Sequence, residues 1–154
     1  MKTNVNVTAE HTNIADNRAA ELAEAFPDVH PGLEPFGDRV LVQIRRARDY
    51  KQLADGKKIY LTKDTQDTEK WNTQVAKVIA LGPVCFKNRN TLEPWPERDW
   101  CKPGDFVRVP KYGGDRWEVP IEGEEDNPAL FAVFKDLDLI GRRVGDPLSM
   151  KAFI

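Results

Sequence analysis

Hydrophobic and polar residues alternate in short stretches over most of the chain, with the period of two that is typical of β-strands. The stretch at residues 39–45 places Val40, Val42 and Ile44 on one face of a predicted strand. Glycine and proline interrupt these stretches, as at Gly82-Pro83. Further strands are expected at residues 74–81, 105–109, 117–119 and 130–134, and a tight turn with a short final strand at 135–140. This pattern predicts an all-β domain, a small barrel or a sandwich.

The first 34 residues follow a different, helical period. Ile14, Leu22 and Phe26 belong to an apolar stripe that Pro27 ends, which predicts a short amphipathic helix near residues 14–26. A helix this short is marginal alone, so its stripe needs a surface on its own domain or on a partner. We expect an N-terminal arm at 1–34, a β-domain at 35–142 and a C-terminal tail at 143–154. The candidate arm contacts are Ile14, Leu22, Phe26 and, in the apolar end of the tail, Phe153.

Two long stretches interrupt the strand rhythm. Residues 46–73 are mostly polar and contain one apolar island, Ile59-Tyr60-Leu61, and residues 83–103 are rich in proline and tryptophan. Irregular segments of this length in a small domain are usually functional or disordered. Both are therefore candidate functional segments.

Charge is nearly balanced, with 25 acidic and 23 basic residues and a net charge of −2. The arm holds six acids and two bases, a balance of −4, so the other 19 acids and 21 bases give +2. This disfavours a nucleic-acid binder, which normally carries a basic domain. The chain has no apolar run long enough to span a membrane and begins without the apolar core of a signal peptide. We therefore expect a cytoplasmic protein.

The residue types needed for metal or covalent chemistry are sparse. The chain has two histidines and two cysteines, and neither a Cys-x-x-Cys nor a His-Glu-x-x-His motif. We expect Cys85 and Cys101, which flank the 83–103 segment, to be unpaired buried thiols; pairing across adjacent strands is the alternative. No catalytic constellation is found, so we expect a protein that is not an enzyme and uses no metal or cofactor.

Charged clusters are interpreted as surface features. The carboxylates at 122–125 and at 136–138 are expected to be solvated turns, because no calcium-loop spacing joins them. The basic stretch formed by Arg45, Arg46, Arg48 and Lys57-Lys58 is interpreted as a solvated loop base, or as a contact with an acidic neighbour.

Six segments, taken in order, resemble the GroES-type co-chaperonin (chaperonin-10) family. They are residues 35–42 (Pro-Phe-Gly-Asp-Arg-Val-Leu-Val), 56–62 (Gly-Lys-Lys-Ile-Tyr-Leu-Thr), 76–82 (Ala-Lys-Val-Ile-Ala-Leu-Gly), 102–107 (Lys-Pro-Gly-Asp-Phe-Val), 111–114 (Lys-Tyr-Gly-Gly) and 130–140, which ends in Asp-Leu-Asp-Leu-Ile. Each segment alone is weakly specific, but six in one order are more so. Together they span about two-thirds of the chain.

The resemblance implies a small irregular β-barrel with a long polar loop and a roof-like hairpin. Members of the family assemble into rings, commonly of seven subunits, in which terminal strands of neighbours pair and cover their edges. The ring docks on a chaperonin cage through a mobile-loop tripeptide and assists protein folding. By resemblance, the docking residues are Ile59, Tyr60 and Leu61, followed by Thr62. Each loop binds weakly, and the ring sums the contributions.

Alternatives remain open at three points. The 59–61 island is either this docking tripeptide or an ordinary extra strand of the chain's own barrel. Trp95 and Trp100 are either roof-tip contacts between subunits or loop packing, which we favour. The whole chain is either a co-chaperonin, such as the divergent members of the family that bacteriophages encode, or a structural virion protein. The second would decorate a capsid, with its arms tied to neighbours and to the major capsid protein.

Overall fold

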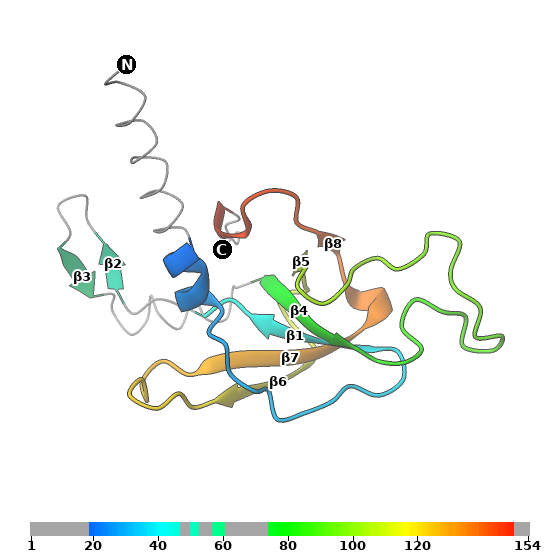
Figure 1. The fold of residues 1–154 in the computed structure, drawn as a ribbon, viewed down its shortest axis with the longest axis horizontal. Helices are drawn as coiled ribbons and strands as arrows, with labels where there is room; N and C mark the ends of the chain where they lie inside the picture. Colours follow the sequence, from blue (N-terminus) through cyan, green and yellow to red (C-terminus); the bar gives the residue numbers. More distant parts are fainter. Residues whose placement is uncertain (1–18, 47–49, 53–56, 61–73, 150–154) are drawn as a thin grey trace, which may run out of the picture.

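The computed structural model describes residues 19–46, 50–52, 57–60 and 74–149, and its main feature is one antiparallel sheet. Six strands lie in the order β6-β7-β1-β4-β5-β8 (Figure 1). They are β1 (Arg39–Ile44), β4 (Val75–Leu81), β5 (Phe106–Arg108), β6 (Asp115–Val119), β7 (Ala129–Lys135) and β8 (Gly141–Arg142). A separate pair is formed by β2 (Tyr50–Gln52) and β3 (Lys58–Tyr60). The prediction of a mainly β chain is confirmed.

Little helix accompanies these strands. Residues 19–25 are helical, and two short 3-10 helices, η1 (Asp136–Asp138) and η2 (Pro147–Ser149), lie near the C-terminal end. The predicted strands at 39–45, 74–81, 105–109 and 130–134 are confirmed, and β6 extends the predicted 117–119 by two residues at its start.

The predicted final strand within 135–140 is wrong. That stretch contains η1, and the last strand, β8, follows at 141–142. The cause is the buried carboxylate of Asp136, which accepts hydrogen bonds from the backbone N–H of Leu137 at 2.8 Å and of Phe86 at 2.9 Å. Such local side-chain bonds compete with strand pairing and favour a turn.

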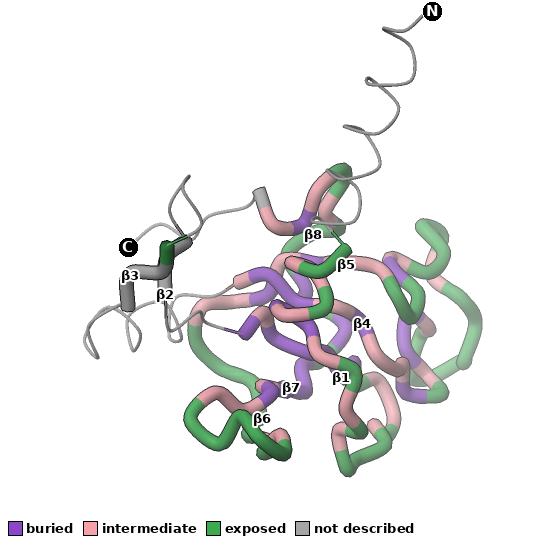
Figure 2. Tube along the Cα trace, turned by 60° about the vertical axis from the view of Figure 1, so that its left-hand side comes forward, coloured by how far each residue is buried: buried purple, intermediate pink, exposed green. Residues whose placement is uncertain are grey.

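Both faces of the sheet are buried along β1 and β7. On one face Val40, Val42 and Ile44, predicted to share a side, belong to the largest apolar cluster, which Phe86 of the 83–103 segment helps to cover. On the other face Leu41 belongs to a second cluster, built from β7 residues and lined by Val29 and Ile121 among others. Figure 2 shows the buried positions concentrated along β1, β4 and β7.

The N-terminal arm docks on the chain's own sheet. Its helix closes with a hydrogen bond from Phe26 N–H to the Leu22 carbonyl at 2.8 Å, directly before Pro27. Further along, the Trp117 indole N–H donates to the Pro31 carbonyl at 3.0 Å. Contacts therefore cross the predicted boundary at residue 34, and the surface that the apolar stripe requires is supplied by its own domain.

Candidate partner-docking site

A long connection, residues 46–73, links two strands that are direct neighbours in the sheet; we call it the excursion. Ile44 of β1 pairs with Ala76 of β4, and the Arg45 N–H donates to the Val75 carbonyl at 3.0 Å, so the two strand ends are held together. Antiparallel neighbours need only a two-residue turn. Residues 46–73 stand in place of that turn. The sheet itself therefore gains nothing from their length.

Part of this excursion forms a small hairpin of its own. Strand β3 pairs with β2, with Ile59 opposite Lys51 and Tyr60 opposite Tyr50. In Figure 1 the hairpin lies beside the main sheet, at the end of the molecule opposite the 83–103 segment. Two of the predicted docking residues, Ile59 and Tyr60, are thus in a strand outside the six-stranded sheet. Leu61 and Thr62 lie outside the described residues.

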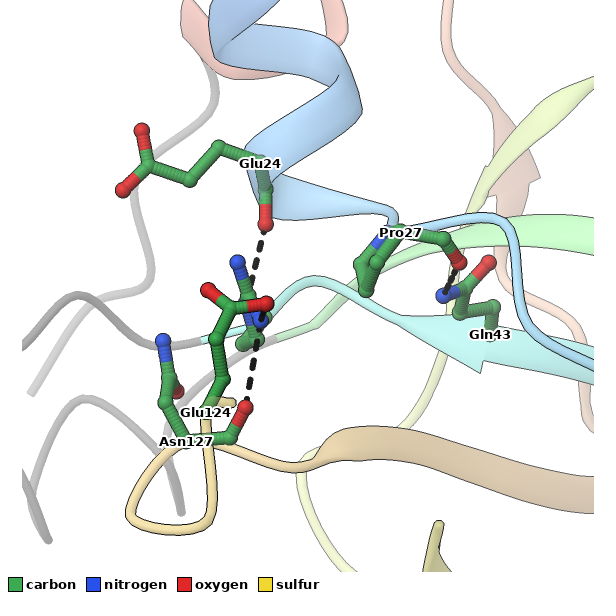
Figure 3. Close-up of polar contacts among 6 residues, drawn as sticks. Glu24, Pro27, Gln43, Glu124 and Asn127 are labelled. Atoms are coloured by element: carbon green, nitrogen blue, oxygen red, sulfur yellow. Dashed lines mark hydrogen bonds and ion pairs between the residues drawn. The ribbon is translucent and has the colours of Figure 1, made fainter. Parts of the chain in front are cut away.

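A buried arginine sits where the excursion leaves β1. The Arg46 side chain is 4% exposed and its guanidinium donates from Nε to the Glu24 carbonyl at 2.9 Å and from Nη1 to the Asn127 carbonyl at 3.1 Å (Figure 3). The same Nη1 lies 3.3 Å from the carboxylate of Glu124. Nearby, Gln43 donates to the Pro27 carbonyl at 2.7 Å. These bonds join the arm, the end of β1 and the turn between β6 and β7.

Arg46 corrects one prediction and supports its alternative. The solvated-loop interpretation is wrong for this residue, because its side chain is buried and paired with the half-exposed carboxylate of Glu124. A contact with an acidic neighbour, the other interpretation, is what the structure contains. No local signal marks this burial, because the odd-numbered and the even-numbered residues of β1 are both buried. Arg48 lies outside the described residues.

The structure describes two of the four predicted arm contacts, Leu22 and Phe26. Leu22 and Phe26 pack in a cluster with Val75 and Phe106, and the Phe26 and Phe106 rings lie 5.2 Å apart between centroids. Ile14 and Phe153 lie outside the described residues.

The 83–103 segment is fastened by aromatic packing. Trp95 lies 4.9 Å from Trp100 between ring centroids, and Phe86 lies 5.6 Å and 5.9 Å from the two. A bridge between Lys87 and Pro94 gives the segment a hairpin-like base. Both tryptophans therefore pack against the chain's own core cluster.

Cys85 and Cys101 are buried free thiols in that same cluster. Burial raises the pKa of Cys85 from 9.0 to about 11 and that of Cys101 to about 12. Cys85 Sγ also lies 3.1 Å from the Arg39 carbonyl, as a donor. Neutral thiols are poor nucleophiles and metal ligands, which leaves them a packing role.

An apolar groove lies at the β6 end of the sheet. It has a volume of about 610 Å³ and runs between residues 33–36 and the edge formed by β6 and β7. Phe36 is 80% exposed there, and Leu33 is 38% exposed. Charged side chains at the rim include Glu34, Asp115 and Lys135. An exposed apolar surface of this kind is typical of a contact with another protein.

Family models and curated proteins give no match to this sequence.

The described residues were also considered for a membrane span and for a metal site. No helix in them combines the length and the apolar character needed to cross a bilayer. Nor do three or more His, Cys, Asp or Glu side chains gather there in a way that would hold a metal ion.

Proposed function

We propose that the chain is a co-chaperonin-like subunit, not an enzyme, that docks on a chaperonin cage through the excursion between β1 and β4. The observation that carries this proposal is the placement of Ile59 and Tyr60 in a hairpin outside the main sheet, between strands that need no such connection. A segment of this kind is free to serve a partner. Its apolar island supplies the contact, and burying an apolar side chain of this size contributes about 1.5–3 kcal/mol before ordering costs.

The fold supports the resemblance segment by segment. Residues 35–42 enter β1, 76–82 run through the end of β4, and 102–107 form the turn into β5. Residues 111–114 form the turn before β6, and 130–140 cover β7 and η1. A GroES-like barrel is therefore the form of β-domain that we propose for this sheet, with the 83–103 segment in the place of the roof-like hairpin.

We propose that the two ends of the sheet are the surfaces through which a ring assembles. The order starts with β6 and finishes with β8, so these two strands are its edges. The apolar groove with Phe36 lies near the first edge, and the exposed Ile140 and Val144 flank the second. A head-to-tail contact between unlike surfaces generates a ring when the rotation that relates neighbouring copies closes. We propose that the groove of one copy accepts the β8 end of the next.

Co-elution on a sizing column tests docking. The wild type, mixed with a chaperonin and nucleotide, should elute together with the chaperonin. Ile59→Asp and Leu61→Asp should each abolish co-elution, because burying a carboxylate in an apolar binding surface of the chaperonin carries a large penalty. Leu92→Asp is the matched control, since Leu92 is an exposed apolar residue of the 83–103 segment. Retention of the Ile59 and Leu61 variants would remove the docking assignment.

A wild type that forms oligomers but binds no chaperonin would favour the alternative, a structural virion protein. Mixing the chain with a phage's major capsid protein or empty capsids would then be the corresponding binding experiment.

A further inference from the structure

The N-terminal arm and the C-terminal segment meet at the base of the excursion. Leu22, Ala25 and Phe26 from the arm pack with Leu148 from the C-terminal side. The cluster is completed by Val75, the first residue of β4 after the excursion, and by Phe106 of β5. We call these six residues the collar. Segments from both ends of the chain thus contact the place where the excursion rejoins the sheet.

Hydrogen bonds connect the collar and its neighbours to Arg45 and Arg46, where the excursion leaves β1; we call these two residues the stem. The Arg46 N–H donates to the Ala25 carbonyl at 2.8 Å, and its Nε donates to the Glu24 carbonyl at 2.9 Å. Arg45 donates from Nη1 to the Leu148 carbonyl at 3.5 Å. The backbone bond is informative, because the Arg46 N–H points away from β4, the pairing of β1 with β7 ends at Ile44, and this N–H bonds to the arm instead. The arm therefore takes the place of a strand partner at this residue.

Because of these contacts, the docking of the arm and the conformational order of the stem depend on each other. The described part of the helix, residues 19–25, is held on the sheet by the packing of Leu22, Ala25 and Phe26 in the collar. The departing stem in turn loses its backbone partner if the helix detaches. Two local equilibria that share the same bonds are coupled, and the coupling acts equally in both directions.

We propose that the arm is a positioning element for the excursion, with Arg46 as its positioning residue: while the helix is docked, it restrains the stem and hence the β2–β3 hairpin. For docking on a partner this inference rests on the proposed function. Restraint before binding removes part of the ordering cost. Release of the arm should then weaken docking even though the docking residues are unchanged.

Two neighbouring positions on the helix supply the test and its control. Leu22 is half-buried in the collar, whereas Ala23 is exposed on the same helix. Leu22→Asp and Ala23→Asp add the same charge to the same turn, but only the first places it against the apolar collar. Any difference between the two therefore reports docking of the helix rather than helix propensity or net charge.

The first measurement uses the free full-length chain and a nitroxide attached to a cysteine introduced at the exposed Lys57 (Lys57→Cys). The native thiols Cys85 and Cys101 are buried, and the chain without the introduced cysteine serves as the control for any labelling at them. The spectrum of the Leu22→Asp chain should lose its immobile component well below the unfolding temperature, whereas the Ala23→Asp spectrum should match that of the parent. Identical spectra in all three chains would overturn the proposal, because a merely structural arm changes stability without changing hairpin motion.

The second measurement is the affinity for a chaperonin in the presence of nucleotide. Leu22→Asp should weaken it by about tenfold, and Ala23→Asp should leave it unchanged. The two measurements separate the claims. Loss of the immobile component without any chaperonin binding by the parent chain would contradict the proposed function and leave the positioning role standing. Unchanged spectra together with normal chaperonin binding would contradict the positioning role and leave the proposed function standing.

Discussion

At the scale of single residues, the buried Arg46 is the least replaceable polar side chain that the structure describes at the base of the excursion. We predict that Arg46→Met lowers the free energy of unfolding by about 3 kcal/mol, because the Glu24 and Asn127 carbonyls lose a buried donor and Glu124 loses its charged partner. Urea unfolding followed by tryptophan fluorescence measures this. Arg89→Met, the same change at an exposed arginine, is the control. Equal midpoints for the two variants would contradict the role given to Arg46.

The two thiols predict a specific dependence of stability on pH. Burial holds the folded-state pKa values at about 11 for Cys85 and about 12 for Cys101, above their ordinary 9.0. From pH 9 upward the unfolded chain therefore releases these protons first, and stability is lost as the pH rises toward the folded values. The wild type should lose more stability between pH 8 and pH 10.5 than a Cys85→Ala, Cys101→Ala variant. Parallel pH profiles would show that burial does not hold the thiols protonated.

At the scale of elements, the end of β4 depends on one close backbone approach. A Cβ on Gly82 would overlap the backbone of Gly37, and the Gly82 N–H donates to the Arg39 carbonyl at 2.8 Å. We predict that Gly82→Ala costs about 3 kcal/mol of stability, since rigid backbone must move to admit the methyl group. At Gly141 a Cβ meets nothing within 4 Å, so Gly141→Ala should leave the thermal midpoint almost unchanged. Two similar midpoints would show that the approach at Gly82 is not tight.

Also at this scale, sequence reasoning succeeded where the period of two was expressed in apolar residues. Val40, Val42 and Ile44 were placed on one face because successive side chains of a strand point to opposite sides. It failed for β2, whose three residues are largely polar, and for β3 it left a strand only as one of two alternatives. The turn at η1 was predicted, but the burial of Asp136 was not, because its partner Phe86 lies fifty residues away in sequence.

The candidate site was predictable in outline only. An apolar island in a polar stretch marked Ile59 and Tyr60, but the collar unites residues from both ends of the chain with β4 and β5. Such contacts are set by the folded topology and have no local pattern. The burial of Arg46 belongs to the same class, since its partners Glu24 and Asn127 come from distant elements.

At the scale of the whole molecule, the account predicts a closed ring held by unlike surfaces. Phe36→Asp should reduce the mass measured by light scattering on a sizing column from that of an oligomer to that of a single chain, because it places a charge in the apolar groove. Ala23→Asp should leave the mass of the oligomer intact, as it alters an exposed site on the arm. An unchanged mass for Phe36→Asp would show that the groove is not the subunit contact.

The central claim is that the excursion between β1 and β4 touches a chaperonin. The most direct measurement places a photo-crosslinking amino acid at position 59 of the otherwise unchanged chain and irradiates it with a chaperonin and nucleotide. The account predicts a nucleotide-dependent product with the combined mass of the chain and one chaperonin subunit, and no such product from the same group at position 92. Products formed only with other copies of the chain, or with a capsid protein offered in competition, would contradict it.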